Sequence, residues 1–209
     1  MTSVLDSITE PLSVHLKNGT TALHESLDQR IMALAPFSSR ERFVCFLRMQ
    51  LRLHLVTSPL YQSAELQKRL PGLGERNRVD AILADCADFA VTEEQLAEDR
   101  SAAAAVWVEE GDAALGWLYT HEGSTLGAAF LLKHARDQLG LSETFGARHL
   151  AGHTEGRGLH WRRFKDELDA IELTAEQREQ ALAGARQAFA FVRASVEALM
   201  AAERAADAV

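Results

Sequence analysis

Cysteine and long apolar runs are scarce in this chain of 209 residues. The two cysteines, Cys45 and Cys86, stand alone without CxxC spacing, so the sequence indicates neither a zinc knuckle nor a disulfide scaffold. No apolar run approaches the roughly 18 residues that a bilayer requires, which excludes a membrane span. The opening stretch MTSVLDSITEPL lacks a basic region followed by an apolar one, so we expect no secretory signal and a cytoplasmic location.

Positive charge is also in short supply. The chain has 22 Lys and Arg against 30 Asp and Glu, which gives a net charge of -8. An acidic protein is repelled by a phosphate backbone, so we expect no nucleic-acid partner.

Proline is absent after Pro71, and the alternation of β-branched residues that marks strands is almost missing. The remainder is rich in Ala, Leu, Glu, Arg and Gln, which favour helices. Three places carry the reciprocal capping pattern of a helix start, Ser38 with Glu41, Thr92 with Gln95 and Thr174 with Gln177. The sequence predicts an all-α chain of about seven helices in one domain, residues 1–209, with frayed ends at 1–10 and 202–209.

We expect helices near residues 13–34, 39–57, 59–69, 74–87, 92–119 with a break near Gly111, 120–140, 158–170 and 174–205. The polar, glycine-rich connection at residues 146–158 is expected at the surface, where it could act as a lid.

A stripe of small residues follows one face of the segment from Leu115 to Lys133, whose apolar period is helical. Its members are Gly116, Thr120, Gly123, Ser124, Gly127 and Ala128. Because each glycine inside a helix costs roughly 1 kcal/mol relative to alanine, something must come close to the backbone there. The spacing leaves two interpretations open. Either a second helix packs tightly into the groove, or a flat ligand lies against the helix above Gly123 and Gly127.

His24 lies beside the apolar face of the first expected helix, and Lys17 precedes it by two turns, roughly 10.5 Å along the axis. A lone histidine at such a position is more often structural than a metal ligand, so spacing alone does not assign it. A di-iron carboxylate site is disfavoured because no glutamate is followed by histidine at the third position. The HExxH pattern of zinc proteases is also absent from the sequence.

Several motifs taken together resemble the bacterial haem oxygenases over nearly the whole chain. The most specific is the glycine-bearing helix, Gly116-Trp117-Leu118-Tyr119 and then Glu122-Gly123-Ser124-Thr125-Leu126-Gly127-Ala128-Ala129-Phe130-Leu131. It lies about one hundred residues after His24-Glu25-Ser26-Leu27, and further matching pieces are Ala35-Pro36-Phe37-Ser38-Ser39-Arg40 and Phe145-Gly146-Ala147-Arg148-His149-Leu150. The resemblance implies a helical bundle in which a proximal helix and a glycine-rich distal helix sandwich haem.

The resemblance implies oxidative opening of haem, which is both cofactor and substrate, to biliverdin, ferrous iron and carbon monoxide with O2 and electrons. By the same resemblance His24 is the axial ligand of the haem iron, and no separate metal is expected. A ligating imidazole needs an acceptor for its other ring nitrogen, for which Glu25 and Glu122 are candidates.

On the distal side, the resemblance implies that Gly123 and Gly127 bring the backbone close to the oxygen. Ser124 stands where the mammalian branch has an aspartate that holds a water network. In the bacterial branch other polar groups route these hydrogen bonds, and Arg78 and His54 are the candidates here.

Three side chains are expected to hold the haem propionates, Lys17, Lys165 and Tyr119. A bacterial branch with rotated haem has asparagine in place of Lys17 and lysine in place of His134. Because this chain departs from that branch at both positions, the resemblance implies unrotated haem and biliverdin opened mainly at the α meso carbon.

The expected partners are a redox protein, such as a ferredoxin or a flavin reductase, and a bacterial phytochrome that accepts the α isomer as chromophore. Release of iron from haem is the other purpose that the family serves. The remaining histidines are expected to be mostly at the surface or structural, namely His15, His54, His121, His134, His149, His153 and His160.

Two rival functions stay open. A haem carrier of the same fold would not open the ring and would show a second axial ligand, for which His121, His149 and His153 are candidates, although the distal glycines argue against it. A thiamin-related hydrolase of similar architecture needs a nucleophilic cysteine beside paired carboxylates, which neither cysteine has in sequence.

Overall fold

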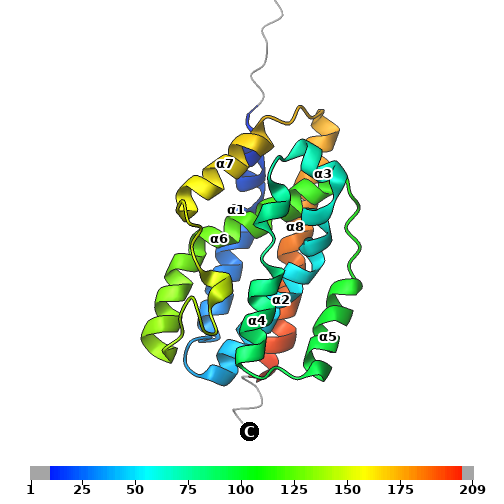
Figure 1. The fold of residues 1–209 in the computed structure, drawn as a ribbon. Helices are drawn as coiled ribbons and strands as arrows, with labels where there is room; N and C mark the ends of the chain where they lie inside the picture. The colour runs from blue at the N-terminus through cyan, green and yellow to red at the C-terminus, as the bar shows by residue number, and fades with distance from the viewer. Residues whose placement is uncertain (1–9, 204–209) are drawn as a thin grey trace, which may run out of the picture.

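The computed structural model describes residues 10–203, and within this range the chain forms helices and no extended strand (Figure 1). The α-helices are α1 (Leu12–Ala33), α2 (Arg40–Gln62), α3 (Ala64–Arg69), α4 (Val79–Asp88), α5 (Glu93–Ala104), α6 (Asp112–Leu139), α7 (Arg157–Asp169) and α8 (Ala175–Val196). Two short 3-10 turns, η1 (Leu73–Arg76) and η2 (Arg148–Leu150), lie in the connections, and a π-helical turn, η3 (Glu197–Ala201), extends α8. The prediction of an all-α fold is confirmed. None of the helices in the described range is long and apolar enough to cross a bilayer.

Helix starts follow the sequence signals closely. Thr92 and Thr174 each accept a hydrogen bond from the backbone N–H of a glutamine three positions on, and each glutamine side chain caps the threonine backbone in return. The third expected capping box is wrong by one residue. Ser38 donates its hydroxyl to the carbonyl of Ala35, and Ser39 instead caps α2.

Two boundaries differ from the expected ones because tertiary packing overrides local signals. Pro59 does not end α2, since Leu60 and Tyr61 directly after it are buried and keep the chain helical to Gln62. The expected boundary between residues 119 and 120 does not exist, and α6 runs unbroken until Gly140 ends it in the left-handed conformation, with φ of 68°. The expected break near Gly111 is present as the α5–α6 connection.

The expected helix at 74–87 begins only at Val79. Ala202 and Glu203, which we expected to fray, are helical, and the other expected frayed positions apart from residue 10 lie outside the described residues.

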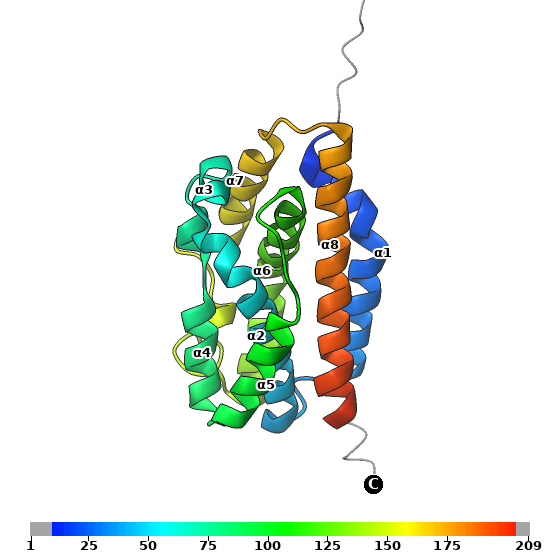
Figure 2. The ribbon, with the colours of Figure 1, turned by 90° about the vertical axis from the view of Figure 1, so that its right-hand side faces the viewer.

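The core is organised around α8, which packs against α1, α2 and α6 (Figures 1 and 2). The closest backbone approach joins α8 to the first half of α6. A Cβ atom on Gly116 would lie 1.9 Å from the carbonyl oxygen of Ala181, and one on Gly184 would lie 2.0 Å from that of Ala113. No other residue fits these two positions without moving the helices apart, so helix packing explains the small-residue stripe at Gly116.

The glycine-rich connection at residues 146–158 is not a free lid, because its first part is anchored to α4. His149 is buried, and Asp85 accepts hydrogen bonds from the backbone N–H groups of Arg148 and His149 at 2.9 Å each. Arg78, just before α4, donates to the carbonyl oxygens of Arg148 and Ala151. The expectation of a surface lid is therefore wrong for this part, because its hydrogen bonds to Asp85 and Arg78 fix it against α4.

Candidate active site

His24 lies on α1 with an exposed imidazole, 58% of whose surface is accessible. Nδ1 lies 3.3 Å from Oδ2 of Asp28, one turn further along the helix, and Phe189 of α8 packs edge-on against the ring with centroids 6.1 Å apart. The prediction that Glu25 or Glu122 accepts from this imidazole is wrong. Asp28 is the carboxylate next to Nδ1, and Glu122 is buried in α6 with other partners. With Nδ1 directed to a carboxylate, Nε2 is the nitrogen suited to bind a metal.

The second half of α6 presents a bare surface. A Cβ atom on Gly127 would meet nothing within 4 Å, and one on Gly123 would make only ordinary contact, 3.5 Å, with the indole of Trp161. Leu126 and Phe130, on the same half of the helix, are 43% and 56% exposed. Large exposed apolar side chains around an open glycine mark a surface that another apolar group covers.

The bare surface and His24 lie on two helices that contact each other. Helices α1 and α6 run in broadly the same direction and contact each other (Figure 1), and Phe37, just after α1, stacks on His134 near the end of α6 with ring centroids 5.5 Å apart. Ser124 lies ten residues before His134, and His24 lies ten residues before Leu34, the cap of α1. Ten helical residues span roughly 15 Å, so Ser124 lies about that far along α6 from His134, and His24 lies about that far along α1 from Leu34, three residues before Phe37.

These features fit haem, a flat apolar macrocycle with an iron that takes an axial nitrogen. The exposed imidazole supplies the nitrogen, Gly127 leaves room for the ring, and Leu126, Phe130 and the 42% exposed Leu23 offer apolar contact. Ser124, the third expected distal residue, directs its hydroxyl to the carbonyl of His121 at 2.7 Å and so takes part in its own helix.

Two of the three expected propionate residues, Tyr119 and Lys165, lie around one aromatic side chain that was not among the expected site residues. Tyr119 of α6 packs on Trp161 of α7 with ring centroids 5.4 Å apart, and Nζ of Lys165 lies 5.8 Å from the centroid of the same indole. Burial, with a smaller contribution from the charge of Asp169, raises the pKa of Tyr119 to about 12, so its phenol stays a donor. Lys17 is exposed on α1.

A buried polar cluster joins α2 to α6 behind the bare surface. His54 and His121 face each other with their Nε2 atoms 3.4 Å apart, and Nδ1 of His121 lies 2.7 Å from the hydroxyl of Thr57 and 3.2 Å from that of Tyr61. Burial lowers the pKa of His121 to about 4. Burial also lowers the pKa of His54, helped by His121, His149 and Arg78. Both imidazoles are therefore neutral at physiological pH.

Glu122 connects this cluster to α7 and to the η1 turn. Its carboxylate accepts from the hydroxyl of Tyr61 at 2.8 Å and from the guanidinium of Arg76 at 2.9 Å, and His160 lies 3.6 Å away. Burial alone would raise the pKa of Glu122, but the hydrogen bond to His160 and the charge of Arg76 hold it below its usual range. Glu122 is thus a buried carboxylate with a full set of partners.

The expectation that the other histidines are mostly surface or structural residues stays a prediction for His54, which packs on His121 and whose buried Nδ1 has no partner in the described part of the chain. His149 is held by Asp85 at 2.7 Å and by Gln50 at 2.6 Å, and His121 by Thr57 and Tyr61. Neither ring can reach an iron atom as a second axial ligand without breaking buried hydrogen bonds, which disfavours these two as ligands of a carrier. The third candidate, His153, is exposed and stacks on His160 with ring centroids 3.8 Å apart.

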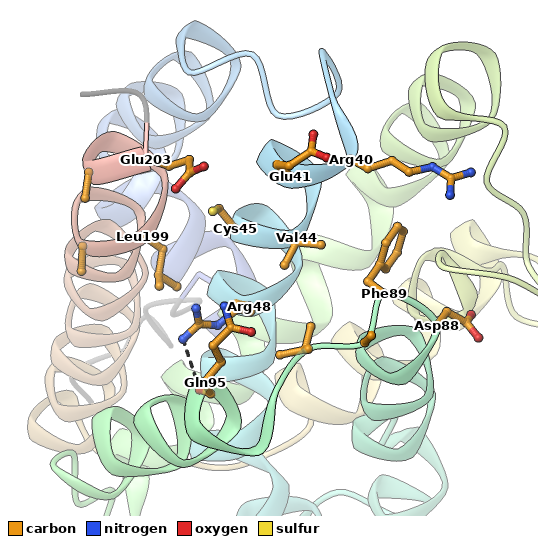
Figure 3. A pocket seen from close by; sticks show the side chains of 14 residues that line it. Arg40, Glu41, Val44, Cys45, Arg48, Asp88, Phe89, Gln95, Leu199 and Glu203 are labelled. Carbon is orange, nitrogen blue, oxygen red and sulfur yellow. Dashed lines mark hydrogen bonds between the residues drawn. The ribbon is translucent and has the colours of Figure 1, made fainter. Parts of the chain in front are cut away.

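A cavity of about 780 Å³ lies away from these residues, between the start of α2, the α4–α5 connection and the end of α8 (Figure 3). Cys45 and Arg48 line it, and it includes none of the expected site residues. The other cysteine, Cys86, is buried, which raises the pKa of its thiol to about 12 together with the charges of Asp99 and Asp85. A thiol with this pKa is a poor nucleophile, which disfavours the hydrolase.

Comparison with known proteins agrees with this site. The Heme oxygenase family model matches residues 10–198. Heme oxygenase PigA of Pseudomonas aeruginosa is 41% identical over 174 residues, which cover 81% of this chain and 83% of that protein. The NO- and CO-bound haem oxygenase of Neisseria meningitidis is 39% identical, with a TM-score of 0.82 over 92% of this chain and 94% of that one.

A more distant structure shares the fold. The haem complex of haem oxygenase-1 from the cyanobacterium Synechocystis sp. is 13% identical, with a TM-score of 0.71 over 95% of this chain and 97% of that one. The resemblance drawn from the sequence motifs is confirmed by the family match and by the two close relatives. The chain therefore belongs to the haem oxygenase family, whose members act on haem, and it is an oxygenase.

Proposed function

We propose that this chain binds haem between α1 and the second half of α6 and converts it, with O2 and electrons, to biliverdin, ferrous iron and carbon monoxide. The observation that carries the proposal is the open surface at Gly127, flanked by exposed Leu126 and Phe130, on the helix that contacts the one bearing the exposed His24. Bound haem supplies the iron at which O2 is activated and the meso carbon that is oxidised.

His24 holds the substrate through Nε2. Its Nδ1 lies 3.3 Å from the carboxylate of Asp28, which favours a proton on Nδ1 and leaves Nε2 free for the iron, and Phe189 packs against the ring. Because the side chain is exposed on α1, its Nε2 is accessible to haem from solvent.

Gly123 and Gly127 of α6 contribute to the site because they have no side chain. At Gly127 the missing side chain lets the macrocycle approach the backbone, and the neighbouring Leu126 and Phe130 exclude water from the ring. Ser124 completes the small-residue surface while its hydroxyl stays bonded to the helix. Gly123 has the same role beside the indole of Trp161.

Lys17, Tyr119 and Lys165 hold the propionates and thereby set the rotation of haem in its plane. The pKa of about 12 keeps Tyr119 protonated, so its phenol donates to a carboxylate, and the two lysines add charge. With lysine at 17 and histidine at 134, the expected product is the α isomer.

His54 and Arg78 belong to the polar side of the site and order the water that brings protons to it. His54 is neutral and buried, and Arg78 is close enough to lower its pKa. The electrons come from a ferredoxin or a flavin reductase, and the α isomer suits a bacterial phytochrome, while the released iron is the second useful product.

The proposal is tested by absorption spectroscopy of the purified protein mixed with haem and given ascorbate or a reductase in air, with catalase present, followed by chromatography of the pigment. Loss of the Soret band with release of α-biliverdin supports it. A Soret band that persists under the same electron supply would establish a haem carrier instead.

The regiochemistry has its own test in Lys17→Asn, with His134→Lys as a second change. Removal of the Lys17 charge is expected to spread the product over other meso isomers. If chromatography still shows a single α isomer after both changes, these side chains do not orient the haem.

A further inference from the structure

The buried pair of histidines between α2 and α6 has hydrogen-bond partners that determine where each proton lies. A hydroxyl has one hydrogen to donate. Thr57 donates its hydrogen to the carbonyl oxygen of Leu53 at 2.9 Å, so its oxygen can only accept from Nδ1 of His121 at 2.7 Å.

Tyr61 leads independently to the same result. Its hydroxyl donates to the carboxylate of Glu122 at 2.8 Å, because an ionised carboxylate can only accept. Its oxygen therefore also accepts from Nδ1 of His121, at 3.2 Å. Arg76 and His160 keep Glu122 ionised, so this direction is fixed.

The proton of neutral His121 accordingly lies on Nδ1, and its Nε2 is a bare acceptor. The group that faces this acceptor is Nε2 of His54 at 3.4 Å, which must then carry the proton of His54. The other nitrogen of His54, Nδ1, remains as a buried acceptor with no protein partner among residues 10–203.

We propose that His121 is a positioning residue that fixes the proton of His54 on Nε2 and so presents the Nδ1 atom of His54 as a hydrogen-bond acceptor to the distal side of the site. An acceptor there takes one hydrogen of a water molecule and leaves the second hydrogen of that water free to donate toward the substrate. With the opposite tautomer, the Nδ1–H group of His54 would donate to the oxygen of that water. Both hydrogens of the water would then point away from His54, so the water would have a different orientation. The proposal rests on the proposed role of His54.

The charged and titratable groups near the pair come from five elements and from the residue before α4. His121 and Glu122 lie on α6, His54 and Tyr61 on α2, and the side chains nearby are Arg76 of η1, Arg78 before α4, His149 of η2 and His160 of α7. None of these groups competes for Nε2 of His121, since the hydrogen bonds of Arg76, Arg78 and His149 go to other atoms.

The direct test is nitrogen NMR of the histidine side chains in the ligand-free protein at neutral pH, with His54→Gln and His121→Gln used to assign the signals. The expected result is a proton on Nδ1 of His121 and on Nε2 of His54. A proton on Nδ1 of His54, or an equal mixture of its two tautomers, would overturn the proposal. Because no haem is present, this result does not depend on whether the chain opens haem.

Two variants connect the tautomer to turnover. His121→Leu removes the acceptor, so His54 is expected to lose its single tautomer and turnover to fall about tenfold, the effect of one hydrogen bond, with haem affinity unchanged. His121→Gln keeps a carbonyl acceptor and is expected to recover the His54 signal and most of the turnover. His15→Leu, a control at a part-buried histidine bonded to Glu10 and Glu179, should change neither.

The outcomes separate the two proposals. Full turnover and an unchanged His54 signal in His121→Leu would refute the role of His121. Failure of the unaltered protein to open haem, with the tautomers as expected, would refute the proposed function and leave the positioning of His54 intact.

Discussion

The two halves of α6 carry glycines for opposite reasons. At Gly116 an added Cβ atom would lie 1.9 Å from a carbonyl oxygen of α8, whereas at Gly127 it would meet nothing within 4 Å. The first half is therefore buried by the protein itself, and the second half is left open beside exposed apolar side chains. A stripe of small residues can thus change its role along a single helix, from packing another helix to receiving a ligand.

The largest expected effect comes from His24→Ala, which affects only the open side. Loss of the axial nitrogen should abolish ring opening, while the unfolding free energy changes by less than about 0.5 kcal/mol, because the side chain is exposed. Biliverdin release and urea unfolding measure the two quantities. Turnover at the wild-type rate would show that His24 is not the ligand.

Gly116→Ala tests the packed half, and we expect it to lower stability while leaving ring opening nearly unchanged. The added Cβ atom meets backbone, not a flexible side chain, so α6 and α8 must separate, and we expect a loss of about 4 kcal/mol. Urea unfolding measures the loss, and activity per folded molecule should stay close to that of the wild type. A loss below about 1 kcal/mol would mean that the two helices are not held at this distance.

Acid should also destabilise the packed half. The pKa of His121 is about 4 in the folded protein against 6.5 for an ordinary histidine, so the unfolded chain binds an extra proton between these values. Its contribution is complete above pH 6.5 and is lost as the pH falls towards 4, by about 3 kcal/mol in all. The unfolding free energy should therefore decrease with falling pH across this window, and the decrease should be smaller in His121→Leu than in the wild type. An unchanged slope would show that His121 is not buried and neutral.

The smallest effect is expected for Gly127→Ala. With open space around the site, the change should stabilise α6 by up to about 1 kcal/mol, because alanine is the better helix former. Thermal unfolding of this variant beside Gly116→Ala compares the two halves directly. Destabilisation at Gly127 would show that this half is packed as well.

Much of the fold follows from local signals in the sequence. Apolar periodicity and capping residues predict most helices, and two threonine capping boxes are present as expected. The continuation of α2 through Pro59 could not be predicted, because it depends on burial of Leu60 and Tyr61 against helices distant in sequence.

The expected site residues were found through family resemblance, since spacing alone left both His24 and the glycine stripe undecided. The sequence could not show that the stripe divides between Gly116 and Gly123, because only the packing of α8 decides it. It also gave no sign that Asp28 pairs with His24 or that His54 and His121 meet, as these contacts depend on side-chain direction and helix register.

The central claim is that the open half of α6 receives haem, and a haem titration of Gly127→Leu followed by absorption tests it most directly. An added Cβ atom at this position would meet nothing within 4 Å, so we expect the variant to fold as well as the wild type, to place its side chain where the macrocycle would lie, and to bind haem at least about tenfold more weakly. Haem binding with wild-type affinity and an unchanged Soret band would contradict the account.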